Sequence, residues 1–115
     1  MNLPHNYLRI VASSNTQLQI KLLNLITDQL NESIISLEKQ VDGTELEQIL
    51  VCTTQIKQGF EFMELEELVI KLNTLEQLLI DHIKLPDLST RLLQISHDAR
   101  DLTEALQLLK QQLMS

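Results

Sequence analysis

Residues 86–113 read PDLSTRLLQISHDARDLTEALQLLKQQL, and this stretch decides the fold class. Its apolar positions are separated alternately by four and three residues: Leu88, Leu92, Ile95, Ala99, Leu102, Leu106, Leu109 and Leu113. An α-helix turns once in 3.6 residues, so this spacing places all of them on one face. A heptad seam of this kind favours packing at a shallow angle against a neighbouring helix. The stretch therefore predicts a long amphipathic helix with a helical partner.

A partner is predicted over residues 16–41, after the polar cluster at residues 13–16. Apolar residues recur there every three or four positions: Leu18, Leu22, Ile26, Leu30, Ile34, Leu37 and Val41. The helix should end at Asp42-Gly43, because glycine tolerates the left-handed conformation that commonly closes a helix. We therefore expect a positive φ at Gly43.

Two shorter helices should lie between these long ones. Residues 44–47 read TELE, a capping box that opens a third helix, with Gly59 as its expected end or a kink. A fourth helix follows, and a break near Pro86 ends it, because the residue before proline avoids helical geometry. The expected inward positions of these helices are Leu46, Ile49, Leu50, Thr53 and Ile56, then Leu65, Leu68, Leu72, Leu75 and Leu79.

The composition agrees with few, long elements, since the 115 residues include only two glycines and two prolines. No strand pattern is present. The sequence predicts an all-α fold: an antiparallel, up-and-down four-helix bundle over residues 1–115, forming a single domain. A short N-terminal helix starting near Pro4 would precede it. The alternative is a homodimer that completes its bundle between two chains.

The formal net charge of −7 argues against binding to nucleic acid or to an anionic membrane surface. No stretch has the length and hydropathy of a membrane span, and residues 1–12 lack the features of a signal peptide. A single cysteine, Cys52, excludes a disulfide within the chain and suits a reducing compartment. A cytoplasmic protein is expected.

Catalytic, metal and cofactor motifs are absent from the sequence, so we expect a protein that is not an enzyme. The three histidines, His5, His82 and His97, are far apart and lack the carboxylate-rich spacing of metal sites. The glutamates near residues 61–67 fit a solvated acidic face, because a di-metal bundle would need inward Glu-x-x-His pairs.

Residues 22–79 present a long amphipathic helix, a glycine turn, a helix with a basic residue near its end, and a leucine-rich helix. This order resembles the histidine-phosphotransfer domain, a four-helix bundle whose His-x-Leu-Lys-Gly motif carries the phosphoacceptor. The corresponding run here is Thr54-Gln55-Ile56-Lys57-Gln58-Gly59. Ile56 and Lys57 match the motif. Thr54 stands at the histidine position and Gln58 at the glycine position, so the resemblance implies a pseudo-phosphotransfer protein that binds without transferring.

A second, shorter run, Ser96-His97-Asp98-Ala99-Arg100, resembles the phosphoacceptor box of sensor histidine kinases. His97 lies almost opposite the apolar seam, so its side chain should be exposed to solvent. Exposure suits a phosphoacceptor and equally suits an idle surface histidine. The chain ends at Ser115 without a nucleotide domain, so a complete kinase is not expected.

Three hypotheses follow. The leading one is a non-catalytic regulatory or adaptor bundle that binds a protein partner, such as a receiver domain or a kinase, through Thr54, Gln55, Lys57 and Gln58. The alternative is a small acidic helical chaperone of a bacterial secretion or flagellar system, whose signature would be an uncovered apolar groove for a client helix. The third is a phosphoacceptor protein that uses His97.

Overall fold

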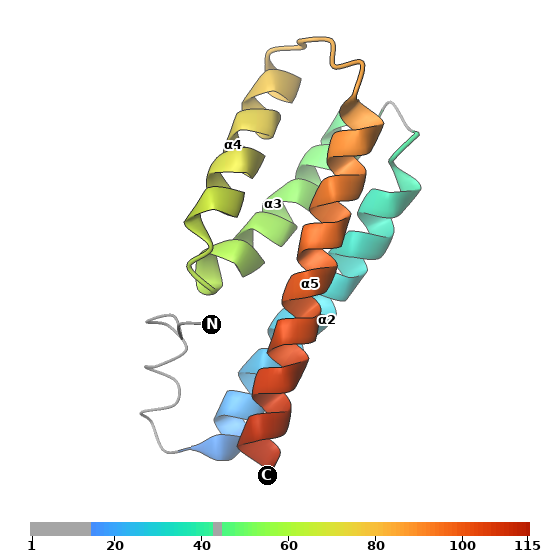
Figure 1. Cartoon of the computed structure of the whole chain (residues 1–115). Helices are drawn as coiled ribbons and strands as arrows, with labels where there is room; N and C mark the ends of the chain where they lie inside the picture. The colour runs from blue at the N-terminus through green and yellow to red at the C-terminus, as the bar shows by residue number, and fades with distance from the viewer. Residues whose placement is uncertain (1–14, 43–44) are drawn as a thin grey trace.

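Four α-helices make up the regular structure of residues 15–42 and 45–115, which the computed structural model describes (Figure 1). They are α2 (Thr16–Lys39), α3 (Leu46–Phe62), α4 (Glu66–Ile80) and α5 (Leu88–Met114). Successive helices run in opposite directions. The prediction of an all-α, up-and-down four-helix bundle is therefore confirmed.

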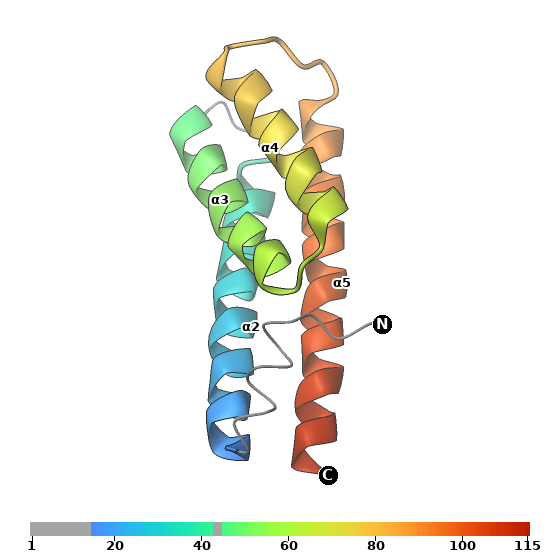
Figure 2. The same ribbon diagram turned by 90° about the vertical axis from the view of Figure 1, so that its left-hand side faces the viewer.

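The four helices differ in length, so only part of the bundle contains all four. The two long helices, α2 and α5, lie side by side along their lengths, whereas α3 and α4 cover only the part near the α4–α5 connection (Figure 2). α3 packs on α2, and α4 makes its one extensive helix contact with α3. α4 is thus attached to the bundle mainly through a single neighbour.

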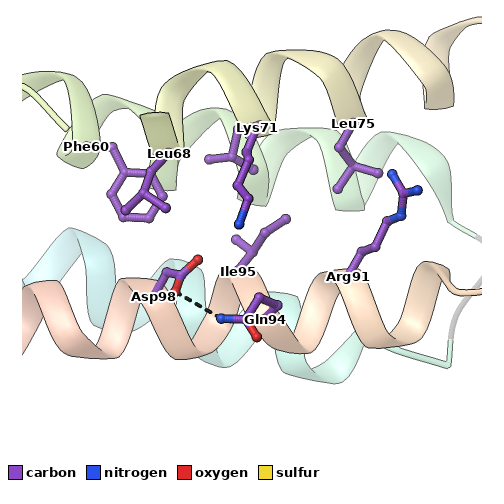
Figure 3. Close-up of a pocket in the computed structure, with 9 residues that line it drawn as sticks. Phe60, Leu68, Lys71, Leu75, Arg91, Gln94, Ile95 and Asp98 are labelled. Carbon is purple, nitrogen blue, oxygen red and sulfur yellow. Dashed lines mark hydrogen bonds between the residues drawn. The ribbon is translucent and has the colours of Figure 1, made fainter. Parts of the chain in front are cut away.

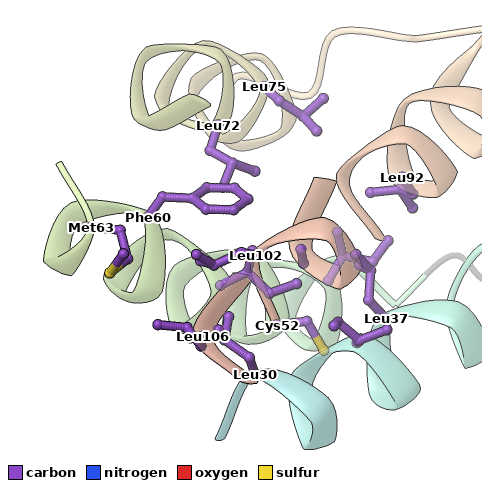
Figure 4. Close-up of a cluster of buried hydrophobic side chains, with 14 of the residues drawn as sticks. Leu30, Leu37, Cys52, Phe60, Met63, Leu72, Leu75, Leu92, Leu102 and Leu106 are labelled. Carbon is purple, nitrogen blue, oxygen red and sulfur yellow. The ribbon is translucent and has the colours of Figure 1, made fainter. Parts of the chain in front are cut away.

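An aliphatic core joins the helices (Figure 4). The side chains of Leu30, Leu37, Ile56 and Phe60 are at most 1% exposed. On α5 the predicted seam is buried at Leu92, Ala99, Leu102, Leu106 and Leu109, and half-buried at Leu88, Ile95 and Leu113. The heptad spacing therefore identified the packed face of this helix correctly.

Gly59 is not the end of the third helix, which corrects the first of the two roles that the sequence predicted for it. α3 continues through this residue to Phe62, and Gly59 is buried within it. A Cβ atom at this position would lie 2.8 Å from Cδ2 of Leu30 on α2. Glycine at this position lets α3 approach α2 closely; the chain does not turn there.

The ends of α3 and α4 are instead formed by left-handed residues that are not glycine. Glu64 has φ 55° and His82 has φ 56°. In both turns the next residue donates its N–H to the carbonyl five positions earlier, at 2.9 and 3.0 Å. This is the Schellman arrangement that closes many helices. α4 is therefore bounded at both ends by a left-handed residue.

Three sequence predictions lie outside the described residues: the short helix starting near Pro4, the positive φ of Gly43 and the capping role of Thr44. Glu45 precedes α3 and makes no capping hydrogen bond with its side chain. Within the described ranges, no helix combines the length and the hydropathy that crossing a bilayer requires.

Candidate functional site

The four residues predicted to bind a partner lie on the side of α3 that faces away from the core. Thr54 and Gln58 are exposed, while Gln55 and Lys57 are half-buried. All four make hydrogen bonds to neighbouring helices, and these bonds divide them between two flanks.

On the flank facing α4, a polar network is centred on Glu76, which is only 7% exposed. Lys57 Nζ lies 2.5 Å from Glu76 Oε1 and donates to Asn73 Oδ1 at 2.9 Å. The other carboxylate oxygen accepts from the hydroxyls of Thr53 at 3.0 Å and Thr54 at 2.9 Å. Partners for both oxygens offset the cost of burying this charge. The network holds α4 against α3 and neutralises the charge of Lys57.

On the opposite flank, Gln55 and Gln58 face α2. Gln55 Oε1 accepts a hydrogen bond from Ser33 Oγ at 2.8 Å. Gln58 Oε1 accepts from Gln29 Nε2 at 3.3 Å. The structure thus joins two of the predicted residues to α4 and the other two to α2. Their binding of a partner stays a prediction.

Thr54, at the position where the predicted resemblance would require a phosphoacceptor, has a carboxylate beside its hydroxyl. The fold places the carboxylate of Glu76 within hydrogen-bond distance of the Thr54 hydroxyl. A base can activate a threonine, yet this carboxylate also binds Lys57 and Thr53. The arrangement is that of a structural network, since each oxygen already has a partner.

His97 has the exposure expected from the sequence, with 68% of its side chain accessible. Its Nε2 lies 3.6 Å from Asp101 Oδ2, and that carboxylate is also exposed. The neighbouring Ser96 donates to Glu38 at 3.0 Å, and Arg100 pairs with the same carboxylate. The residues beside His97 therefore join α5 to α2, and phosphorylation of His97 stays a prediction.

An apolar groove, which we call the α4–α5 groove, lies between α4 and α5 (Figure 3). It has a volume of about 210 Å³. Five apolar residues line it: Phe60, Leu68, Leu72, Leu75 and Ile95. Four polar residues complete the lining: Lys71, Arg91, Gln94 and Asp98. The groove exists because α4 packs on α3 and makes little contact with α5.

The lining side chains differ in burial, which distinguishes the floor of the groove from its mouth. Phe60, Leu72 and Leu75 are at most 3% exposed and form the floor. Leu68 on α4 and Ile95 on α5 are half-buried and lie at the two sides of the mouth. An apolar group entering the groove would therefore meet aliphatic side chains from both helices.

The polar residues of the groove differ in how they are paired. Arg91 Nε donates at 3.1 Å to Asp87, which does not line the groove. Asp98 accepts from Gln94 at 3.0 Å. Lys71 makes no side-chain hydrogen bond or ion pair in the described part of the chain. The groove thus contains two cations and one carboxylate in a chain whose net charge is −7.

Outside the groove, the possible metal ligands and the cysteine of the described residues form no further candidate site. Among the described residues, no group of three histidine, cysteine, aspartate or glutamate side chains is placed to hold a metal ion. Cys52 is 3% exposed, and its burial raises the pKa of the thiol above the ordinary value of 9.0. Burial of this kind makes a thiol less reactive.

Sequence reasoning missed both the groove and Glu76. Leu68, Leu72 and Leu75 were identified as inward positions, but the spacing of one helix does not reveal whether a second helix covers it. Glu76 was overlooked because a glutamate in a helical pattern is ordinarily exposed. The available signal was Thr53-Thr54 and Lys57 one turn apart on the preceding helix, a set of donors that a buried carboxylate needs.

Comparison of the chain with protein-family models, with curated proteins and with solved structures found no match.

Proposed function

We propose that this bundle is a non-catalytic protein-binding domain that accepts an apolar segment of a partner protein in the α4–α5 groove. The observation that carries the proposal is the groove itself, with Leu68 and Ile95 at its mouth and Leu72 on its floor. The described residues leave this apolar surface uncovered, and its removal from water by a partner would be thermodynamically favourable.

The size of the groove favours a protein segment over a small molecule. Ligand pockets for small molecules commonly have volumes of about 300–1,000 Å³, whereas this groove has about 210 Å³. That space suits one or two side chains. A partner helix or strand would place such side chains in the groove and contact its rim with the rest of its surface.

Between the two protein-binding hypotheses, the groove supports the chaperone-like one more directly. A helical chaperone needs an uncovered apolar groove for a client segment, and the α4–α5 groove fits that requirement. A pseudo-phosphotransfer role would use the outer face of α3, where Thr54 and Gln58 are exposed. Lys57 contributes little free charge to that face, because it is paired with Glu76. We retain that role as the second candidate.

A peptide selection tests the proposal. A phage-displayed library of 16-residue peptides would be selected on the wild-type protein, and the affinity of each enriched peptide measured for Leu68→Gln and Ile95→Gln. We expect these substitutions at the groove mouth to weaken binding about tenfold or more, because they remove apolar contacts at the centre of the interface.

Matched controls come from the same two helices. Ile70 is 63% exposed and Leu93 is 52% exposed, and neither lines the groove. Ile70→Gln and Leu93→Gln remove a similar apolar group and should change affinity less than about twofold, because surface substitutions away from a contact have small effects. Enriched peptides that bound all four variants equally, or a library that yielded no binder, would refute the proposal.

A further inference from the structure

We infer that the occupant of the α4–α5 groove is an amphipathic helix with an acidic residue beside its apolar anchors. This inference rests on the proposed function and adds to it the chemistry of the partner. The spacing of the groove walls and the charges at their rim support it.

Both walls of the groove repeat at helical spacing. α4 contributes Leu68, Lys71, Leu72 and Leu75, and α5 contributes Arg91, Gln94, Ile95 and Asp98. Each set is spaced i, i+3, i+4 and i+7, so each wall spans about two turns, or roughly 10 Å. A third helix laid between two such walls would present two of its residues to the floor, spaced i and i+3 or i+4, and would contact the rim with the rest of these two turns. Two turns of helix therefore match the groove in length and period.

The rim of the groove carries a cation, Lys71, that makes no ion pair with the described residues. Its side chain extends from α4 toward α5 across the groove mouth (Figure 3), and it has no partner in the described part of the chain. Arg91 on the other wall forms an exposed ion pair with Asp87. A glutamate or aspartate one turn from an apolar anchor would pair with Lys71, whereas a lysine there would be repelled. Figure 3 shows the Lys71 side chain pointing toward the Asp98–Gln94 part of α5, with Arg91 at the other end of that wall. The preference for acid should therefore be strongest on the side of Lys71 that faces Arg91, away from the carboxylate of Asp98.

The enriched peptides from the selection above provide the test. We expect them to carry apolar residues at helical spacing with an aspartate or glutamate three or four positions from one of them. Lys71→Glu should weaken their binding about three- to tenfold, because an attractive rim pair becomes a repulsive one. The effect should shrink at roughly 0.5 M salt, where the Debye length falls well below 10 Å. Lys21 is exposed on α2 and does not line the groove, so Lys21→Glu makes the same charge change away from it and should alter affinity less than about twofold.

The outcomes separate this inference from the proposed function. Peptides that depend on Leu68 and Ile95, but show no acidic enrichment and no loss on Lys71→Glu, would refute the inference and leave the proposed function standing. A concentration-dependent dimer in sedimentation that Leu68→Gln abolishes would assign the groove to a second copy of this chain, which also overturns the inference. An absence of any groove-dependent peptide would overturn both.

Discussion

Lys57 Nζ on α3 lies 2.5 Å from Oε1 of Glu76 on α4, in a position where both side chains are largely withdrawn from water. Their side chains are 19% and 10% exposed. α4 has extensive contact with α3 alone among the helices, so this pair lies at the principal attachment of α4. Its energetic contribution decides how firmly one wall of the α4–α5 groove is held.

The first prediction is that the two partners contribute unequally to stability. Lys57→Met leaves Glu76 buried without its cation and should lower the free energy of unfolding by about 3 kcal/mol. Glu76→Gln should cost less, because the lysine can extend toward solvent and the amide oxygen still accepts from Thr53. Urea denaturation monitored by circular dichroism measures both values.

The double variant Lys57→Met/Glu76→Leu is the control for this prediction. It removes both charges together, so its cost should be well below the sum of the two single substitutions. Strictly additive costs would mean that the pair is too well solvated to couple its partners.

The sequence predicts the apolar faces that pack the helices together, but it does not predict the polar contacts between α3 and α4. The seam of α5 and the inward leucines of α4 follow from spacing alone, because burial of apolar residues sets the helical period. The pairing of Lys57 with Glu76 does not, because it depends on the rotation of α3 relative to α4. The groove depends similarly on the tilt of α4, which no residue pattern within one helix specifies.

The second prediction concerns the close approach of α3 and α2. Gly59→Ala gains about 1 kcal/mol of helix propensity, but its Cβ would lie 2.8 Å from Cδ2 of Leu30. Leu30 is 1% exposed and has little room to move, so overpacking should cost about 1–3 kcal/mol. We expect net destabilisation, measured by thermal denaturation.

A double-mutant cycle isolates this steric contact. Leu30→Ala alone should destabilise by about 2–5 kcal/mol through lost burial and a cavity. In that background Gly59→Ala should become neutral or stabilising, because the new methyl group enters the space that was vacated. The idea fails if Gly59→Ala has the same effect in both backgrounds.

The third prediction concerns the left-handed residues at the two ends of α4. The sequence predicted a left-handed conformation at a glycine, Gly43. Glu64 and His82 adopt this conformation in the structure, and it costs conformational free energy because their Cβ atoms are crowded. His82→Gly should therefore raise the free energy of unfolding by roughly 0.5–1 kcal/mol, since glycine adopts this conformation without strain. Glu64→Gly should act in the same direction, and calorimetry measures both.

The control for this prediction is Asp81→Gly, one position earlier. Asp81 has an ordinary φ of −79°, so glycine there relieves no strain and increases the freedom of the unfolded chain. It also removes the exposed hydrogen bond that Gln77 Nε2 donates to Asp81 Oδ1 at 3.1 Å, so it should destabilise. A loss of stability in His82→Gly similar to that in Asp81→Gly would contradict the assignment.

The fourth prediction is that Cys52 is unreactive while the bundle is folded. The thiol is 3% exposed, and burial raises its pKa, so its reactive thiolate is scarce at neutral pH. Because the pKa of the thiol is higher in the folded chain than in the unfolded chain, ionisation of Cys52 does not affect the free energy of unfolding at neutral pH. As the pH rises above 9.0, the thiol ionises more readily in the unfolded chain, and the free energy of unfolding falls. Labelling by a chromogenic disulfide should be slow and should accelerate with urea in step with unfolding. Rapid labelling without urea would reveal frequent local opening around α3.

The last prediction is that Thr54 does not transfer a phosphoryl group, although Glu76 lies beside it. Onward transfer needs a phosphorylated group of high transfer potential, which an imidazole nitrogen provides and a threonine ester does not. The Thr54 hydroxyl also donates to a carboxylate that Lys57 and Thr53 already engage, so deprotonation would break a satisfied network. After incubation with acetyl phosphate, we expect no label on Thr54. Thr54→Ala should change peptide binding in the groove less than about twofold, because Thr53 and Lys57 still hold Glu76. Acid-labile phosphate that disappears in His97→Gln would support the phosphoacceptor hypothesis instead, because His97 is 68% exposed. Acid-stable label on Thr54 that passes to a receiver aspartate would overturn the prediction, and Glu76→Gln would then establish whether the carboxylate serves as the base.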